Sequence, residues 1–326
     1  MGHLVDGVWQ ADKPKPKSGD GRFQRAETQF RNWITPDGAA GPTGTDGFEA
    51  EAGRYHLYVS LACPWAHRTM IVRRLKGLED FIGLSSVDAI ALEDGWEFNE
   101  AFPDPLFGKK RIYEIYLEAD PRYTGRASVP VLWDKNRRTI VSNESSEIIR
   151  MLNTAFDGIG ADTSVDLYPA PLRDEIDRIN SVVYDTVNNG VYKSGFATTQ
   201  QAYEDAVAAV FATLDDLDER LGRQRYLAGD RMTEADWRLF TTLVRFDAIY
   251  VGHFKCNIRR IVDYPNLSNY LRELYQVPGV AGTVDIAYTK RHYYGSHRSI
   301  NPLGIIPIGP ELDLDAPHNR ARLRAA

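Results

Sequence analysis

Hydrophobic and polar positions alternate along residues 54–60, and this period of two predicts a strand. Pro64 then begins a helical stretch that runs to about residue 76, since proline is favoured at the first helical position. Residues 81–89 predict a second strand. The order strand, helix, strand is typical of a βαβ unit with a parallel strand pair.

Two further apolar runs, residues 129–133 and 139–142, also predict strands, and the turn between them is short enough for a hairpin. Pro130 inside the first run requires an edge strand, a bulge or a cis peptide bond. A helix is expected over about residues 144–156. The order here is therefore β-α-β followed by β-β-α.

The second half of the chain has the spacing of amphipathic helices. Apolar residues recur every three or four positions over residues 207–221, and we expect Gly222 to end that helix. Residues 233–236 resemble a capping box at the start of another helix. The pattern fades at residue 286, which predicts an extended tail over residues 286–326, and we expect its basic end, residues 319–324, to be solvated.

These patterns predict an arm followed by two domains. Residues 1–50, rich in Gly, Pro, Lys and Asp, form an arm with weak local structure. Residues 51–160 form an α/β domain, and residues 161–326 form an all-α domain. Residues 90–127 interrupt the α/β pattern with many Gly, Pro and aromatic residues, so we expect an insertion near a site.

The composition excludes several function classes. A chain of 326 residues with 43% hydrophobic residues can bury two cores. Its net charge of −6 argues against a nucleic-acid partner, and no apolar run is long enough to span a membrane. We therefore expect a soluble cytoplasmic protein. No metal is expected, since two cysteines make no thiolate site and the histidines have no usual ligand spacing; these are His67, His292 and His297.

Cys63 is the residue with the clearest chemistry. It lies between a predicted strand and a helix that begins with proline, where the helix N-terminus favours thiolate over thiol. Position 66, where a dithiol enzyme would have its second cysteine, is Ala66, so the site is monothiol and an external thiol must complete any disulfide exchange. Cys256 could do so only if folding brought it near. The alternative is that Cys63 is a buried, inert cysteine.

Three motifs give the chain a family resemblance. Leu61–Arg68 (LACPWAHR), Ser128–Val131 (SVPV) and Ser142–Glu147 (SNESSE) resemble the cysteine-type glutathione transferases. The insertion with Trp96, the segment Asn189–Tyr192 and the segment His292–His297 narrow this to the Xi class, the glutathionyl-hydroquinone reductases. The resemblance implies a thioredoxin-like domain followed by the helical glutathione-transferase domain, and a homodimer.

The resemblance also implies roles for residues that bind glutathione, the co-substrate. Val129, before a cis-Pro130, would pair with the cysteinyl part. Glu144 and Ser145 would hold the γ-glutamyl end, which suits the start of a helix, although plain helix capping explains them too.

Trp96 and Arg126 would clamp the rest of the tripeptide. Without the resemblance, core packing would explain Trp96, and a solvated loop charge would explain Arg126. Tyr192 and Tyr293 would bind the hydroquinone through their hydroxyls and act in catalysis, with Tyr294 as the alternative to Tyr293.

The implied activity removes glutathione from glutathionyl-hydroquinones through a mixed disulfide on Cys63. A second glutathione would resolve this disulfide and give oxidised glutathione. Two alternatives stay open. One is an omega-like thioltransferase or dehydroascorbate reductase, which needs only Cys63 and the glutathione site. The other is a non-catalytic binding module with the same fold.

Overall fold

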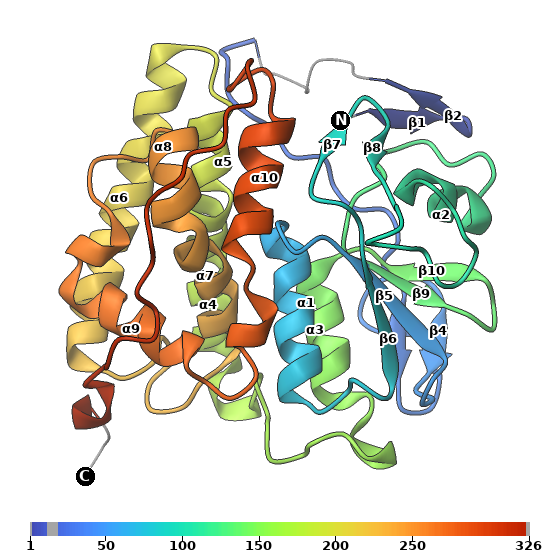
Figure 1. The fold of residues 1–326 in the computed structure, drawn as a ribbon. Coiled ribbons are helices and arrows are strands. Elements are labelled where there is room, and N and C mark those ends of the chain that lie inside the picture. Colours follow the sequence, from blue (N-terminus) through green and yellow to red (C-terminus); the bar gives the residue numbers. More distant parts are fainter. Residues whose placement is uncertain (1, 12–18, 324–326) are drawn as a thin grey trace. The chain divides into compact units, whose positions relative to one another are not determined.

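The computed structural model describes residues 2–11 and 19–323, which form two compact units (Figure 1). Within these residues, the first unit comprises residues 2–11 and 26–165, and the second comprises residues 19–25 and 166–323. Among the same residues, no helix is long and apolar enough to cross a membrane.

The first unit is built on a four-stranded sheet in the order β10-β9-β5-β6 (Figure 1). Strand β5 pairs in parallel with β6 and antiparallel with β9, and β9 pairs antiparallel with β10. The βαβ unit and the hairpin predicted from the sequence are therefore confirmed. The strands span Tyr55–Val59 (β5), Ile82–Ser86 (β6), Val131–Asp134 (β9) and Thr139–Ser142 (β10).

Helices α1 (Pro64–Leu75) and α3 (Ser145–Thr154) lie side by side on one face of this sheet (Figure 1). Every residue of β5 is buried, and Tyr58 of this strand contacts the insertion through its ring, which lies against Phe98, and its hydroxyl, which donates to Asp104 Oδ1 at 2.9 Å. Pro64 occupies the first helical position of α1, as its lack of an N–H group favours. A short 3₁₀ turn, Asp157–Ile159, follows α3.

The insertion at residues 90–127 is ordered. It holds a two-stranded sheet of β7 (Ala91–Leu92) and β8 (Gly95–Trp96), and helix α2 (Ile112–Ala119). The eight residues of α2 bury Ile112, Ile115 and Tyr116. So short a helix, among so many Gly and Pro residues, leaves little periodicity in the sequence.

The arm has more structure than its composition predicts. Strands β1 (His3–Val5) and β2 (Val8–Gln10) form an antiparallel hairpin, and β3 (Trp33–Thr35) pairs in parallel with β4 (Gly47–Glu49). Strands of three residues carry no readable alternation. The prediction for the arm also covered residues 1 and 12–18, which lie outside the described residues.

The second unit is helical, as the spacing of its apolar residues predicts. Its helices are α4 (Arg173–Val183), α5 (Gly190–Gly195), α6 (Gln200–Arg223), α7 (Glu234–Arg245), α8 (Val251–His253), α9 (Pro265–Tyr275) and α10 (Ile286–Ser296). Wider π-helical turns span Tyr184–Asn188 and Phe246–Tyr250, and 3₁₀ turns span Ala170–Leu172, Ile261–Asp263, Ala281–Thr283 and Arg320–Leu323.

The observed ends of two helices can be compared with the ends predicted from the sequence. The capping box is confirmed, because the Thr233 backbone N–H donates to Asp236 Oδ2 at 2.8 Å at the start of α7. The prediction that Gly222 ends its helix is wrong by one residue, since α6 includes Gly222 and ends at Arg223.

The prediction of an extended tail from residue 286 is wrong at its start. Helix α10 begins there, and the Asp285 side chain caps it by accepting a hydrogen bond from the Tyr288 N–H at 2.8 Å. The helix is made largely of Tyr, His, Lys and Thr, so its hydrophobic contrast is weak.

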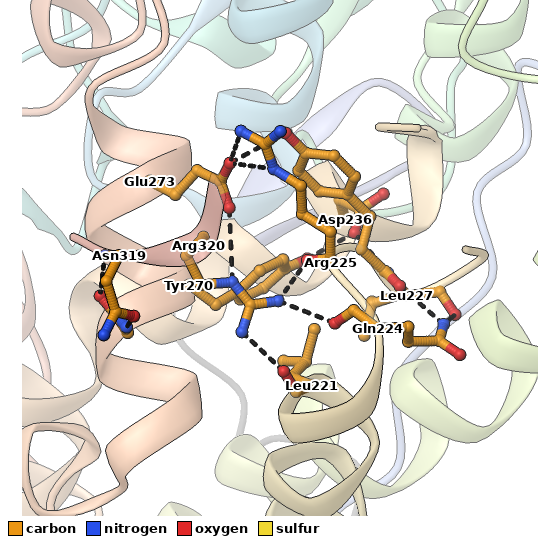
Figure 2. A network of polar contacts seen from close by, with 11 residues as sticks. Leu221, Gln224, Arg225, Leu227, Asp236, Tyr270, Glu273, Asn319 and Arg320 are labelled. Atoms are coloured by element: carbon orange, nitrogen blue, oxygen red, sulfur yellow. Dashed lines mark hydrogen bonds and ion pairs between the residues drawn. The ribbon is translucent and has the colours of Figure 1, made fainter. Parts of the chain in front are cut away.

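The basic end of the chain is not simply solvated, because the Arg320 side chain is only 1% exposed. Figure 2 shows its guanidinium between the end of α6 and α9. It donates to the Leu221 carbonyl at 2.7 Å and the Gln224 carbonyl at 3.0 Å, and forms an ion pair with Glu273. These hydrogen bonds and the ion pair hold the end of the chain against helices α6 and α9. Arg324, at the end of this predicted segment, lies outside the described residues.

Candidate active site

Cys63 is the N-cap residue of α1, directly before Pro64. The turn is held by the Cys63 N–H, which donates to the Ser60 carbonyl at 3.0 Å, and by the His67 N–H, which donates to the Cys63 carbonyl at 2.9 Å. The side chain is half-buried rather than sealed in the core. The thiol therefore sits at the positive end of a helix, as the sequence predicts, where a thiolate is favoured.

The Val129 backbone lies beside this thiol. The Cys63 S–H donates to the Val129 carbonyl with Sγ and oxygen 3.4 Å apart. The Val129–Pro130 peptide bond is cis, which was one of the three conformations that Pro130 allowed. Strand β9 begins one residue later, so the sheet fixes this backbone next to Cys63.

Glu144 is the N-cap residue of α3, and Ser145 is the first residue of that helix. The Glu144 carboxylate accepts hydrogen bonds from the Ser146 N–H at 3.0 Å, the Ser146 hydroxyl at 2.8 Å and the Thr28 hydroxyl at 3.1 Å. Burial alone would raise its pKa, but these bonds and the charge of Arg68 outweigh burial and lower it. The start of α3 thus combines a carboxylate with the N–H groups of a helix terminus.

Trp96 and Arg126 lie at the two ends of the insertion. Trp96 closes the short strand β8 opposite Ala91 and is buried. Arg126 is half-buried, and its carbonyl accepts a hydrogen bond from the Tyr123 hydroxyl at 3.3 Å. Both residues are held in ordered backbone of the same unit as Cys63.

The two tyrosines from the sequence come together in the second unit. Tyr192 on α5 and Tyr293 on α10 have their hydroxyl oxygens 2.6 Å apart. Tyr250, at the end of a π-helical turn, adds a third hydroxyl 3.1 Å from that of Tyr293. Burial raises the pKa of both Tyr250 and Tyr293 well above its usual value, so both hydroxyls stay protonated.

Tyr294 lies apart from this hydroxyl cluster. Its hydroxyl donates to the Ala248 carbonyl at 3.4 Å. Of the two neighbouring tyrosines that the sequence could not separate, Tyr293 is therefore the one whose hydroxyl meets that of Tyr192.

Cys256 is buried, and two of the histidines contact each other. Cys256 is 0% exposed, and burial raises the pKa of its thiol to about 12. His253 and His297 contact each other through ring nitrogens 3.1 Å apart. In the part of the chain that the structure describes, no three His, Cys, Asp or Glu side chains are grouped to hold a metal ion.

Comparison with known proteins identifies the family. Residues 62–155 match the glutathione S-transferase N-terminal domain, and residues 200–273 match its C-terminal domain. A glutathionyl-hydroquinone reductase of Escherichia coli (strain K12), YqjG, is 59% identical over 324 residues, which cover 98% of each chain. The chain belongs to the Xi class of glutathione transferases.

Solved structures of this class share the whole fold. The glutathione-bound structure of the Escherichia coli K-12 relative has a TM-score of 0.91 at 57% identity, covering 98% of this chain and 99% of the other. The Xi-class glutathione transferase of Natrialba magadii has a TM-score of 0.90 at 48% identity, covering 99% of this chain and 98% of the other. The predicted family and the predicted order of a thioredoxin-like and a helical domain are confirmed.

Three residues that contact candidate site residues within their own unit were not predicted from the sequence. Thr28, in the arm, donates to Glu144 across more than 100 residues of chain. Tyr250 joins the tyrosine hydroxyls from a π-helical turn. Arg25 places its guanidinium 4.8 Å from the centre of the Tyr192 ring. Only the fold of each unit brings these residues to their partners, and no local motif marks them.

Proposed function

We propose that this Xi-class enzyme removes glutathione from glutathionyl-hydroquinones, the activity for which its Escherichia coli relative is named. The observation that carries the proposal is the Cys63 thiol, half-buried at the start of α1 and next to the Val129 carbonyl. Cys256, the other cysteine of the sequence, is sealed. A monothiol site of this kind suits exchange with an external thiol.

One set of residues binds the glutathionyl part of the substrate, and a second set binds its aromatic part. The glutathione site comprises Cys63, Trp96, Arg126, Val129, Glu144 and Ser145. In it, the start of α3 binds the γ-glutamyl end, the Val129 backbone pairs with the cysteinyl part, and Arg126 with Trp96 binds the remainder. The aromatic site comprises Tyr192 and Tyr293, whose hydroxyls bind the hydroquinone oxygens.

In the first step, the Cys63 thiolate attacks the sulfur of the glutathionyl group. The substrate reacts as its keto tautomer, in which the carbon bonded to sulfur already carries a proton. The carbon–sulfur bond breaks, and its electron pair returns to the ring oxygen, which gives the hydroquinone after protonation. The tyrosine hydroxyls stabilise the charge that develops on this oxygen.

In the second step, glutathione reduces the mixed disulfide on Cys63. Its thiolate attacks the glutathione sulfur of that disulfide and gives oxidised glutathione, and the Cys63 thiolate leaves. The sum is one glutathionyl-hydroquinone and one glutathione converted to one hydroquinone and one oxidised glutathione. The cycle needs no metal and no other reductant.

We place this activity in the cytoplasm, where glutathione is kept reduced, and we propose that the enzyme is a homodimer. Light scattering coupled to size exclusion tests the second point, with an expected mass of about twice the 36.8 kDa of one chain. A mass equal to one chain would exclude the homodimer without affecting the chemistry.

Replacement of Cys63 tests the proposed function. A Cys63→Ser variant is expected to bind glutathione, measured by calorimetry, yet to lose at least about a thousandfold in turnover, because serine is a far weaker nucleophile than a thiolate. Cys256→Ser is the matched control and is expected to keep wild-type turnover. Near wild-type turnover of Cys63→Ser would refute the mechanism.

A further inference from the structure

The N-terminal hairpin contacts the backbone beside Arg126. The Leu4 N–H donates to the Gly125 carbonyl at 2.8 Å, and the Gly125 N–H donates back to the Leu4 carbonyl at 3.0 Å. The Leu4 side chain is fully buried. Since Gly125 directly precedes Arg126, this pair of bonds fixes the point from which the Arg126 side chain projects.

The same hairpin contacts the backbone beside Trp96 through Trp9. The Trp9 indole N–H donates to the Glu93 carbonyl at 3.1 Å, and its ring stacks on Tyr113 with centroids 4.4 Å apart. A Cβ atom on Gly95 would lie 3.1 Å from the Trp9 ring, so glycine permits this close approach. Gly95 directly precedes Trp96.

A second stretch of the arm, residues 19–25, contacts the helical unit around Tyr192. The Gly21 carbonyl accepts a hydrogen bond from the Thr198 N–H at 3.1 Å, and Arg22 forms an ion pair with Asp205 at 2.7 Å. These contacts fix the stretch at the start of α6.

Arg25 and Phe23 then meet the tyrosine itself. The Arg25 guanidinium carbon lies 4.8 Å from the centre of the Tyr192 ring, and Arg25 Nε donates to Asn189 Oδ1 at 2.9 Å. The Phe23 ring stacks on Tyr192 with centroids 6.5 Å apart. A cation on the face of a phenol holds the ring in place and makes its hydroxyl a stronger hydrogen-bond donor.

We propose that the arm positions the two sites separately: residues 2–10 position the glutathione site through Trp9, and residues 19–25 position the aromatic site through Arg25. Trp9 and Arg25 are positioning residues, since each acts through a neighbour that contacts the substrate. The inference rests on the proposed function, because it takes Trp96, Arg126 and Tyr192 as substrate-binding residues.

Trp9 is tested by glutathione binding. In the Cys63→Ser background, which forms no mixed disulfide, Trp9→Ala is expected to raise the Kd for glutathione about fivefold, the effect of losing one aromatic stack. Val8→Ala is the matched control, because Val8 is the preceding residue of β2 and its side chain is 60% exposed. Should Trp9→Ala not fold, Trp9→Phe keeps an aromatic ring for the stack on Tyr113 but loses the N–H that bonds Glu93, and it is expected to raise the Kd about twofold.

Arg25 is tested by turnover of a glutathionyl-hydroquinone with Cys63 intact. Arg25→Ala is expected to lower kcat/KM about tenfold, with partial recovery in Arg25→Lys, which retains the charge but not the planar guanidinium. In the Cys63→Ser background, Arg25→Ala is expected to leave the Kd for glutathione unchanged. Gln24→Ala, at an exposed neighbour, is the control.

The outcomes separate this inference from the proposed function. An unchanged glutathione Kd in Trp9→Ala would overturn the role of residues 2–10. Unchanged turnover in Arg25→Ala, or a raised glutathione Kd in that variant, would overturn the role of residues 19–25. Failure of the unmodified enzyme to turn over the glutathionyl-hydroquinone would instead refute the proposed function.

Discussion

The thiols of Cys63 and Cys256 differ in their exposure and in the local structure around them. Cys63 is half-buried at the N-terminus of α1, where a thiolate is favoured. Cys256 is fully buried, and the pKa of its thiol is raised to about 12 by burial. A thiol with that pKa is almost wholly protonated at neutral pH, so Cys256 is neither a nucleophile nor a resolving thiol in the folded chain.

Tyr293 distinguishes the proposed activity from omega-like thiol transfer. Tyr293→Phe is expected to lower kcat on a glutathionyl-hydroquinone about tenfold, because it removes one of the hydroxyls that we propose stabilise the developing charge. Glutathione binding to the Cys63→Ser form should not change. A general thioltransferase would need no tyrosine hydroxyl, so unchanged kcat would favour that alternative.

Tyr294→Phe is the matched control for this prediction. The Tyr294 hydroxyl contacts the Ala248 carbonyl and not the tyrosine cluster, so the variant is expected to turn over like the unmodified enzyme. The reverse result, with activity lost in Tyr294→Phe and kept in Tyr293→Phe, would show that the assignment of the two tyrosines is wrong.

Some candidate site residues were predicted from a local sequence signal, some only from the family resemblance, and some not at all. Cys63 was located because Pro64 marks a helix start, whereas Glu144 was assigned from the family resemblance, with which its place at the start of a helix agrees. Thr28, by contrast, reaches Glu144 only through the path of the arm. Tyr250 sits on a π-helical turn, whose extra residue shifts side chains off the ordinary helical spacing.

Among the elements, the sheet strands and their helices were predicted because each buries a continuous or periodic set of apolar side chains. The same reasoning failed for α10, which is rich in Tyr and His, and for the three-residue strands of the arm. These elements are held by contacts with distant parts of their own unit, such as the Leu4 bonds to Gly125. Such contacts leave no pattern in the local sequence.

Arg320 connects the chain's tail to helices α6 and α9, and its loss should destabilise the helical unit. Arg320→Ala is expected to lower the free energy of unfolding by about 3 kcal/mol, because it leaves the buried Leu221 and Gln224 carbonyls without their donor and removes one of the two arginines that pair with Glu273. Urea unfolding followed by circular dichroism measures the change. Arg322→Ala, in the same 3₁₀ turn but exposed, is the control and should cost less than about 0.5 kcal/mol.

Equal losses in the two arginine variants would contradict this account of the tail. They would mean that overall positive charge near the end of the chain, rather than the buried contacts drawn in Figure 2, supports the helical unit.

For the whole molecule, the order of an α/β domain and an all-α domain follows from the change of hydrophobic period along the chain.

The stability of the folded chain should depend on pH through His56, a buried residue of β5 whose Nε2 lies 2.8 Å from the Ser85 hydroxyl oxygen. Burial lowers the pKa of His56 to about 4. Its ordinary value of about 6.5 applies in the unfolded chain.

Between these two values, the unfolded chain binds a proton that the folded chain does not, so the free energy of unfolding rises with pH in that window. His56 should therefore cost about 1.4 kcal/mol of stability for each pH unit below about 6.5, until about pH 4. Urea unfolding at pH 7.5 and pH 5.5 measures the slope. His56→Gln is expected to flatten it, and an identical slope in both proteins would contradict the assignment.

Mass spectrometry of the intact enzyme tests the central claim most directly. The enzyme is mixed with a glutathionyl-hydroquinone in the absence of free glutathione, quenched with acid and digested without reductant. The account predicts one glutathione per chain, located on Cys63 and absent from Cys256, together with an equal amount of released hydroquinone. Release of hydroquinone with an unmodified Cys63 would contradict it.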